Sequence, residues 1–141
     1  MSEAFTIEGN TILNSHQGGP SGGAAINATA ANGELRNNVI TGSTGAIAVR
    51  VATGNLTSEC NVFWNNVEGD VVGFTLDETD VVADPLFCDP TLGNYGVSEI
   101  SPCLPENNPN CSDLIGVYGM GCGAISVEPM SWGRLKGMWL R

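Results

Sequence analysis

The chain has 141 residues, enough for one domain with a buried core, and 42% of them are hydrophobic although only 6% are aromatic. Fifteen acidic residues oppose five basic ones, which gives a formal net charge of −10. A surface this acidic repels nucleic acid and anionic lipid, so we expect no nucleic-acid partner and no membrane contact. The 19 glycines favour short β-strands joined by tight turns over a helical bundle.

Six short segments alternate between apolar and small or polar residues, with the period of two that is typical of β-strands. We call three of them the asparagine-bearing segments, because each has an asparagine directly before a β-branched residue: 5–13, 34–41 and 56–64. The other three are 24–30, 46–52 and 70–76. Turn-forming residues, mainly Gly, Ser and Asn, separate the segments. We therefore predict one β-strand in each segment.

An asparagine recurs at the same place in each asparagine-bearing segment, as Asn10, Asn38 and Asn61, in steps of 28 and 23 residues. A self-similar unit of this length, built from strands and turns, is typical of a solenoid. We predict an all-β fold, a right-handed parallel β-helix of about three coils. In it the three asparagines form a ladder at a corner, where asparagine tolerates the left-handed backbone conformation. An antiparallel β-sandwich is the alternative.

The same alignment of units predicts further stacked positions. The next corner is marked by Asn14, Asn65 and Asn66. One inward-facing column consists of Ile12, Ile40 and Phe63, and a second of Ile26, Ile47 and Val72. Period-two alternation places Trp64 outside if Phe63 is inside.

The repeat fades after Thr79, and residues 81–123 contain four of the five cysteines and five of the seven prolines. An open last coil would expose strand edges and core, so we predict that this segment caps the coil. The expected division is coils at 1–80, a cysteine-rich cap at 81–124 and a tail at 125–141. The tail is expected to form a short amphipathic helix or a linker.

The cysteines are Cys60, Cys88, Cys103, Cys111 and Cys122. They show no CxxC spacing and the only histidine is the distant His16, so a zinc site is not expected. Two disulfides would leave one thiol over. The clustering favours a bond from Cys103 to Cys111 or Cys122, with Cys60 and Cys88 left open. Reduced cysteines in a cytosolic protein are the alternative.

Disulfides point to a secreted or cell-surface protein, yet residues 1–10 contain no basic region followed by an apolar stretch, as an export signal would. A strand-like pattern begins at Phe5. We therefore expect the chain to be part of a longer protein, in which case N-terminal coils of the same protein would be a partner of this segment.

Three motifs lie in the second half of the chain: ECNVFWNN at 59–66, DPLFCD at 84–89, and a run from SPC at 101–103 to GMGCG at 119–123. Together they resemble the C-terminal end of bacterial secreted right-handed parallel β-helix repeat proteins of the pectin-lyase-like superfamily. The tail SWGRLKGMW at 131–139 is also similar to a tail of such proteins. The resemblance implies the fold and secretion. It says little of activity, because the superfamily contains polysaccharide lyases, hydrolases and non-catalytic binders.

A calcium-dependent lyase needs clustered carboxylates for Ca²⁺ and a base for proton abstraction. Asp77, Glu78 and Asp80 are the candidate Ca²⁺ ligands. The only basic residues of the predicted coils, Arg36 and Arg50, are expected on different faces, so we assign no catalytic residue.

We therefore expect a non-catalytic structural or carbohydrate-binding module that contacts a polysaccharide or another surface component. Trp64 is the candidate sugar platform, and packing of Trp64 against the cap is the competing interpretation. The alternative function is a fragment of a polysaccharide lyase or glycoside hydrolase whose active coils lie upstream.

Overall fold

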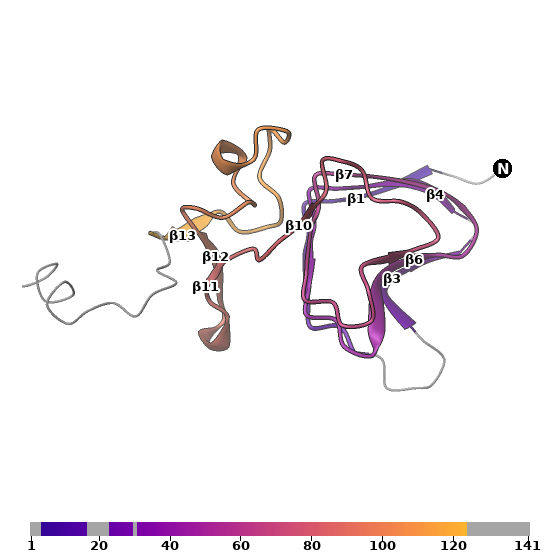
Figure 1. Ribbon diagram of the computed structural model, residues 1–141, viewed down its shortest axis with the longest axis horizontal. Coiled ribbons are helices and arrows are strands. Elements are labelled where there is room, and N and C mark those ends of the chain that lie inside the picture. The colour runs from indigo at the N-terminus through magenta and orange to yellow at the C-terminus, as the bar shows by residue number, and fades with distance from the viewer. Residues whose placement is uncertain (1–3, 17–22, 30, 124–141) are drawn as a thin grey trace, which may run out of the picture.

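The computed structural model describes residues 4–16, 23–29 and 31–123. These form an all-β fold: three parallel sheets stack as the sides of a β-helix with about three coils, and a small mixed sheet follows (Figure 1). The predicted tail, with the amphipathic helix expected there, lies outside the described residues.

Strands from successive coils pair in parallel within each side of the β-helix. The first sheet contains β1 (Ala4–Glu8), β4 (Ala31–Arg36) and β7 (Gly54–Glu59). The second contains β2 (Thr11–Leu13), β5 (Val39–Thr41), β8 (Val62–Trp64) and β10 (Val81–Val82). The third contains β3 (Gly23–Ala28), β6 (Ala46–Val51) and β9 (Val71–Val72). With β10, the coils extend just past the boundary suggested at residue 80.

Each asparagine-bearing segment, predicted as one strand, is two strands joined at a corner. The residue directly before each ladder asparagine turns the chain: Gly9, Asn37 and Cys60 have φ angles of 71°, 56° and 56°. The prediction that the ladder asparagines themselves adopt the left-handed conformation is therefore wrong. Turning the chain and forming the ladder hydrogen bonds fall on neighbouring residues. The reason is that a residue that turns the chain cannot also keep its side chain in the ladder column.

At the next corner, Asn14 and Asn65 do take positive φ angles, of 54° and 53°. Asn66 beside them has a different role, because its side chain bonds to the neighbouring coil. Its Oδ1 accepts from the backbone N–H of Ser43 at 3.1 Å, and its Nδ2 donates to the backbone oxygen of Ile40 at 3.0 Å.

One predicted inward column is confirmed. Ile12 aligns with Ile40 and Ile40 with Phe63, and the last two side chains are fully buried.

The second predicted column is wrong, because Ile26 aligns with Val49 and Val71. Ile47 instead aligns with Ala24, and Val72 with Arg50. The corner loops differ in length between coils, so Ile47 lies two residues and Val72 one residue from the position that aligns with Ile26. The shift of one residue moves Val72 to the other face of its strand.

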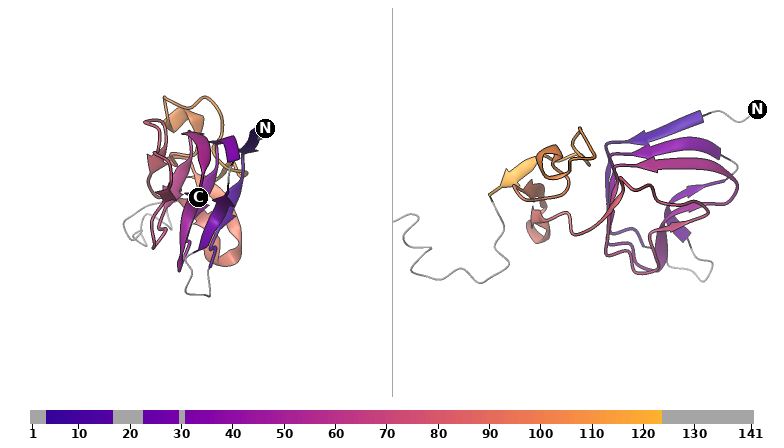
Figure 2. Two further views of the ribbon diagram at one scale, coloured as in Figure 1. Left: turned by 90° about the vertical axis from the view of Figure 1, so that its right-hand side faces the viewer. Right: turned by 45° about the horizontal axis from the view of Figure 1, so that its top comes forward.

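The cysteine-rich segment lies beside the coils rather than over their end (Figures 1 and 2). We call residues 84–123 the flanking module. It contains β11 (Phe87–Asp89), β12 (Asn94–Ser98), β13 (Met120–Cys122) and two short 3₁₀ helices, at Pro90–Leu92 and Pro105–Asn107. It covers the outer face of the second sheet, where Val39 and Val62 are buried in one cluster with Leu104 and Ile115.

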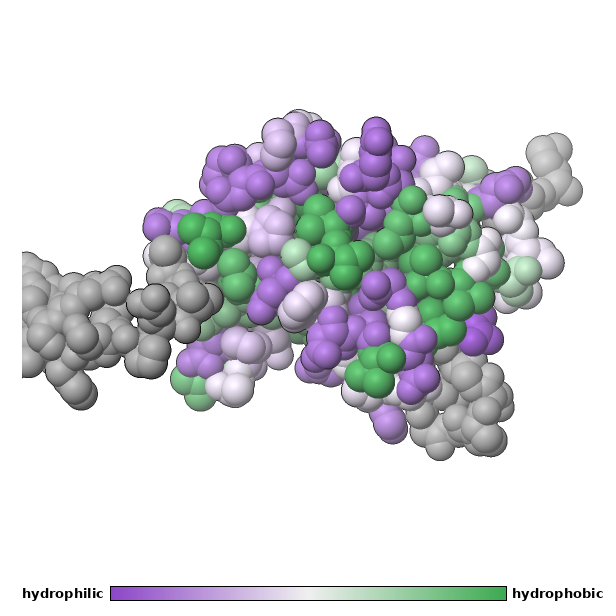
Figure 3. Space-filling model, in the orientation of Figure 1, coloured by the Kyte–Doolittle hydropathy of each residue, from purple (hydrophilic) through white to green (hydrophobic). Residues whose placement is uncertain are grey.

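The segment between β9 and β10 closes the end of the last coil, a role that had been expected of the cysteine-rich segment. Phe74 and Leu76 pack against the inner core cluster that contains Leu35, Ile40 and Phe63. In Figure 1 the last coil runs inside the outline of the earlier ones, and Figure 3 shows hydrophobic side chains gathered over the coil on the same face.

Two disulfides are present, and the pairing favoured from the sequence is wrong. Cys60 at a coil corner bonds to Cys111 of the flanking module, and Cys88 bonds to Cys122. Cys103 is free and buried. The two disulfides indicate an oxidising, extracellular environment. Among the described residues, no helix is long and apolar enough to cross a bilayer.

Gly116 lies where the flanking module packs tightly against the coils. It has a φ angle of 89°, and its N–H donates to the backbone oxygen of Asn37 at 2.7 Å. A Cβ added there would lie 2.8 Å from Thr11 Oγ1 and 2.8 Å from Val39 Cγ2.

We expect Gly116→Ala to lower the free energy of unfolding by about 2–4 kcal/mol, because the methyl group adds both backbone strain and overpacking. Urea denaturation measures the change. Gly119→Ala is the control, because a Cβ at Gly119 meets no atom within 4 Å. Equal effects of the two substitutions would show that the module does not seat on the coil at Gly116.

Candidate functional site

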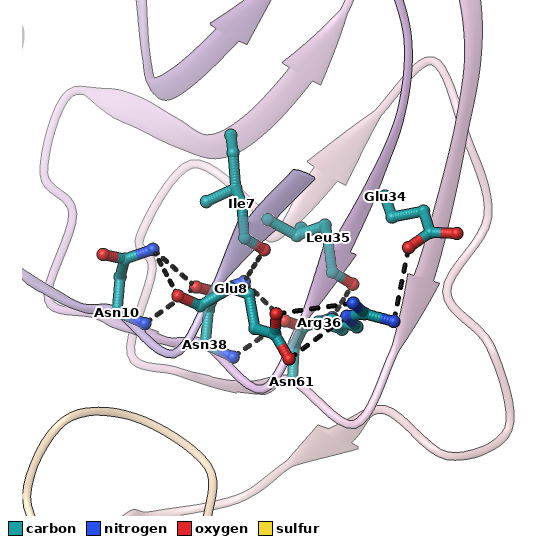
Figure 4. A network of polar contacts seen from close by, with 8 residues as sticks. All are labelled: Ile7, Glu8, Asn10, Glu34, Leu35, Arg36, Asn38 and Asn61. Atoms are coloured by element: carbon teal, nitrogen blue, oxygen red, sulfur yellow. Dashed lines mark hydrogen bonds and ion pairs between the residues drawn. The ribbon is translucent and has the colours of Figure 1, made fainter. Parts of the chain in front are cut away.

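The asparagine ladder runs along one corner of the coil stack (Figure 4). Asn38 Oδ1 accepts hydrogen bonds from the backbone N–H and the Nδ2 of Asn10, at 3.0 and 3.1 Å. Asn61 Oδ1 accepts the same two bonds from Asn38, both at 3.0 Å. Each Nδ2 also donates to a backbone oxygen: that of Asn38 to Ile7 and that of Asn61 to Leu35. The structure therefore joins the three predicted ladder residues directly.

Asp80 follows Asn61 in the ladder, which the sequence pattern did not reveal. Its Oδ1 accepts from the backbone N–H and the Nδ2 of Asn61, both at 2.9 Å. Its Oδ2 accepts from Ser58 Oγ at 2.6 Å and from the backbone N–H of Asp77 at 2.8 Å. The spacing of 19 residues from Asn61 to Asp80 departs from the earlier steps, which hid this position.

The candidate Ca²⁺ ligands Asp77, Glu78 and Asp80 lie in one turn, and hydrogen bonds occupy two of their carboxylates. Asp80 accepts the ladder hydrogen bonds from Asn61. Asp77 Oδ2 accepts hydrogen bonds from the backbone N–H and the hydroxyl of Thr79. These bonds from Thr79 hold the pKa of Asp77 below its ordinary value. Across the described ranges, no group of three or more His, Cys, Asp or Glu side chains is arranged to hold a metal ion.

Trp64 lies at the end of β8, in register with Thr41, which in turn aligns with Leu13. Its neighbour Phe63 is fully buried, whereas 40% of Trp64 is exposed. The indole therefore lies on the outer face of the second sheet, next to the flanking module. This placement agrees with the period-two expectation.

A cleft of about 220 Å³ lies between the second sheet and the flanking module, and Trp64 is part of its lining. The coil side of the lining also includes Leu13, Asn14, Thr41, Gly42 and Asn65. The module side consists of Asp84, Pro85, Phe87, Pro90 and Tyr95. Trp64 therefore borders the flanking module, as the packing interpretation expects, and still reaches solvent, as the sugar-platform interpretation requires.

The other aromatic residues of the cleft pack with rings of the flanking module and not with Trp64. Phe87 and Tyr95 pack edge to face with ring centroids 5.4 Å apart, and Tyr95 also contacts Tyr118 at 6.2 Å. No ring contact among the described residues includes Trp64. The module rings thus pack against one another, and the indole of Trp64 is not part of their cluster.

Oxygen and amide groups supply the polar chemistry of the cleft. One carboxylate oxygen of Asp84 accepts from the N–H of Leu86 at 2.9 Å, which fixes its orientation. The side-chain amides of Asn14 and Asn65 make no hydrogen bond within the described part of the chain. No basic residue belongs to the lining, so the cleft carries negative charge.

The first sheet has a second hollow, lined by both polar and apolar residues. A shallow depression of about 470 Å³ there is lined by Thr6, Asn32, Glu34, Asn55 and Thr57, with Phe5 and Gly33. Beside it, Arg36 forms ion pairs with Glu8 at 3.2 Å and with Glu34 at 3.4 Å (Figure 4). The one aromatic residue of this depression, Phe5, is partly buried, whereas Trp64 is exposed.

The remaining candidates are separated. Arg36 belongs to the first sheet and Arg50 to the third, so the structure does not bring them together. His16 Nδ1 contacts the backbone oxygen and the hydroxyl of Thr44 in the neighbouring coil, at 3.1 and 3.0 Å. His16 thus contributes to coil stacking and Arg36 to ion pairing.

The protein is thus a β-helix-like solenoid whose outer face carries a disulfide-bonded module, with an aromatic cleft at their junction. Comparison with protein-family models, curated proteins and solved structures finds no match to this chain.

Proposed function

We propose that this protein is a non-catalytic, secreted or cell-surface β-helix module that binds carbohydrate in the cleft at Trp64. The observation that carries the proposal is the partly exposed indole, unpaired with any described ring, beside amide and carboxylate groups. An aromatic face covers the apolar side of a sugar ring, and amides and carboxylates bond to its hydroxyls. The motif resemblance to secreted pectin-lyase-like proteins agrees with this class of ligand.

The charge of the cleft favours a neutral glycan over a uronate polymer. Asp84 is its only charged lining residue, and the protein as a whole carries a formal charge of −10. A carboxylated sugar would meet repulsion and find no arginine or lysine in the lining. We therefore propose neutral, hydroxyl-rich oligosaccharides as ligands.

The size of the cleft limits affinity. Its volume of about 220 Å³ lies below the range of about 300–1,000 Å³ that is typical of small-molecule pockets, so it accommodates one sugar unit. At about −0.3 kcal/mol for each of roughly twelve non-hydrogen atoms, one ring gains about −4 kcal/mol, which corresponds to a millimolar Kd. Useful binding to a polymer then requires several modules or several contacts.

We expect Trp64→Ala to weaken the binding of neutral oligosaccharides about tenfold, because it removes a stacking contact worth about 1.5 kcal/mol. Chemical shifts of the protein, titrated with xylo-, manno- and cello-oligosaccharides, measure the Kd. Leu92→Ala is the control: Leu92 is 83% exposed and does not line the cleft. Unfolding curves of both variants verify that the fold is intact.

Two results would overturn the proposal. The first is unchanged binding by Trp64→Ala. The second is release of unsaturated or reducing sugars from polygalacturonate, with or without Ca²⁺, which would support the lyase or hydrolase alternative.

A further inference from the structure

The hydrogen bonds that end on a side-chain oxygen of the ladder all run in one direction. Each asparagine donates two bonds, from its backbone N–H and its Nδ2, to the Oδ1 of the next coil. The two ends of the ladder are therefore chemically different. At the last coil, the ladder must end in a residue that only accepts hydrogen bonds. At the first coil, the ladder begins with an Oδ1 that receives no hydrogen bond from a preceding coil.

Asp80 completes the ladder at the last coil. A carboxylate has no N–H to satisfy, and each Asp80 oxygen already accepts two hydrogen bonds. The neighbouring Phe74 and Leu76 pack against the core at this end. The ladder therefore needs no further donor at this end, although Phe74 and Leu76 are only partly buried and β7, β9 and β10 are edge strands.

At the first coil the ladder is not completed in this way. Asn10 is exposed, and its Oδ1 accepts no hydrogen bond from any described residue. Ile7 and Ile12 are only partly buried, whereas Leu35 and Ile40, their register partners one coil later, are fully buried. β1, β2 and β3 each pair on one side alone. Both ends have strand edges and partly buried apolar side chains, and the unfilled ladder acceptor distinguishes the first coil from the last.

We infer that the first-coil face, formed by β1, β2 and β3, is a docking surface for a further parallel β-helix coil that presents an asparagine in the ladder column. Such a coil supplies the backbone N–H and the Nδ2 that Asn10 Oδ1 can accept, and it extends all three sheets. The inference is independent of the proposed carbohydrate site.

The ladder argues against a second copy of this chain as the occupant. A copy stacked by its last coil would bring Asp80, which has only acceptors, toward the acceptor of Asn10. A copy stacked by its first coil would place two Asn10 acceptors face to face. The donors must come from a coil whose ladder asparagine has a backbone N–H and an Nδ2 that are not already hydrogen-bonded to another coil.

The experiment adds such a coil to the protein, at the N-terminal end of β1. A copy of residues 32–54 is joined directly before Ala4, because Ala4, Asn32 and Asn55 share one register position. In a matched second version the copied Asn38 carries Asn38→Asp, which removes the amide donor and keeps the shape. Urea unfolding gives the folding equilibrium constant of each chain, and sedimentation gives its oligomeric state.

We expect the asparagine version to raise the folding equilibrium constant at least about tenfold, since a stacked repeat adds interface stability. The aspartate version should lose most of this gain. A third comparison uses Asn10→Leu, which should cost more in the extended chain than in the original one. Since Asn10→Leu leaves the later coils intact, this comparison does not depend on a variant that fails to fold.

Three outcomes would overturn the inference. One is no gain from the added coil. Another is an equal gain from the asparagine and aspartate versions, with the same cost of Asn10→Leu in both backgrounds. The third is dimerisation of the original chain that the added coil abolishes, since the occupant of the face would then be a second copy.

Discussion

Replacing Asn61 by leucine is expected to lower the free energy of unfolding by about 3–5 kcal/mol. Asn61 is fully buried, and its side chain bonds to Asn38, Ser58 and Asp80 and to the backbone oxygen of Leu35. Leucine has a similar size but leaves several of these groups buried without a partner, each at a cost of about 1–3 kcal/mol. Urea or thermal denaturation measures the loss.

Asn10→Leu is the matched control for this prediction. Asn10 stands in the same column but is exposed and occupies only one end of the ladder. Its replacement is expected to cost about 1 kcal/mol, because water can reach the groups that it leaves. If Asn61→Leu cost no more than Asn10→Leu, the ladder would contribute little to stability and would be a consequence of stacking rather than a cause.

Removing the disulfide between Cys60 and Cys111 is expected to cost about 4 kcal/mol. The bond closes a loop with a sequence separation of 51 residues, and the chain-entropy model gives about this value for such a loop. It is the covalent link between a coil corner and the flanking module. The double variant Cys60→Ala with Cys111→Ala is the appropriate test, because Cys111 left alone would share a buried cluster with the free Cys103.

The control for this prediction is Cys88→Ala with Cys122→Ala, which removes a bond inside the flanking module with a separation of 34 residues. Its entropic cost is similar, but the module stays tied to the coil. Limited proteolysis distinguishes the two variants: loss of the Cys60–Cys111 bond should expose the module as a whole to cleavage. Equal protection of the module in both variants would contradict this role for the bond.

Cys103 provides an internal check on the pairing. Burial raises the pKa of its thiol to about 11, so the group stays protonated and unreactive in the folded protein. One thiol per chain should therefore react with an alkylating reagent after unfolding without reductant, and almost none before unfolding. A rapidly reacting thiol in the folded state would show that Cys103 is not the unpaired cysteine.

Much of the coil follows from local pattern. The recurrent asparagine, period-two alternation and turn residues predicted stacked parallel strands, the column from Ile12 to Phe63, and the outward position of Trp64. These succeed because each coil repeats the same physical demands: an apolar side chain inward and an amide at the corner. The second column failed because loops of unequal length place Ile47 two residues, and Val72 one residue, from the positions that align with Ile26.

The candidate site depended on contacts that no local pattern contains. The cleft has one side from the coils and the other from residues 84–95, and its shape arises where the module docks. Asp80 could be recognised as a ladder residue only once its oxygens faced Asn61.

The sequence by itself determined the class of fold, the ladder positions Asn10, Asn38 and Asn61, and the expectation of disulfides, because these depend on residues a repeat apart. Only the tertiary structure decided that Cys103 is the unpaired cysteine, that Phe74 and Leu76 close the last coil, and that the flanking module covers the side of the coil. The physical reason is that an irregular segment has no period. Its position is set by the apolar surface that it can bury, and that surface exists only after the coils have formed.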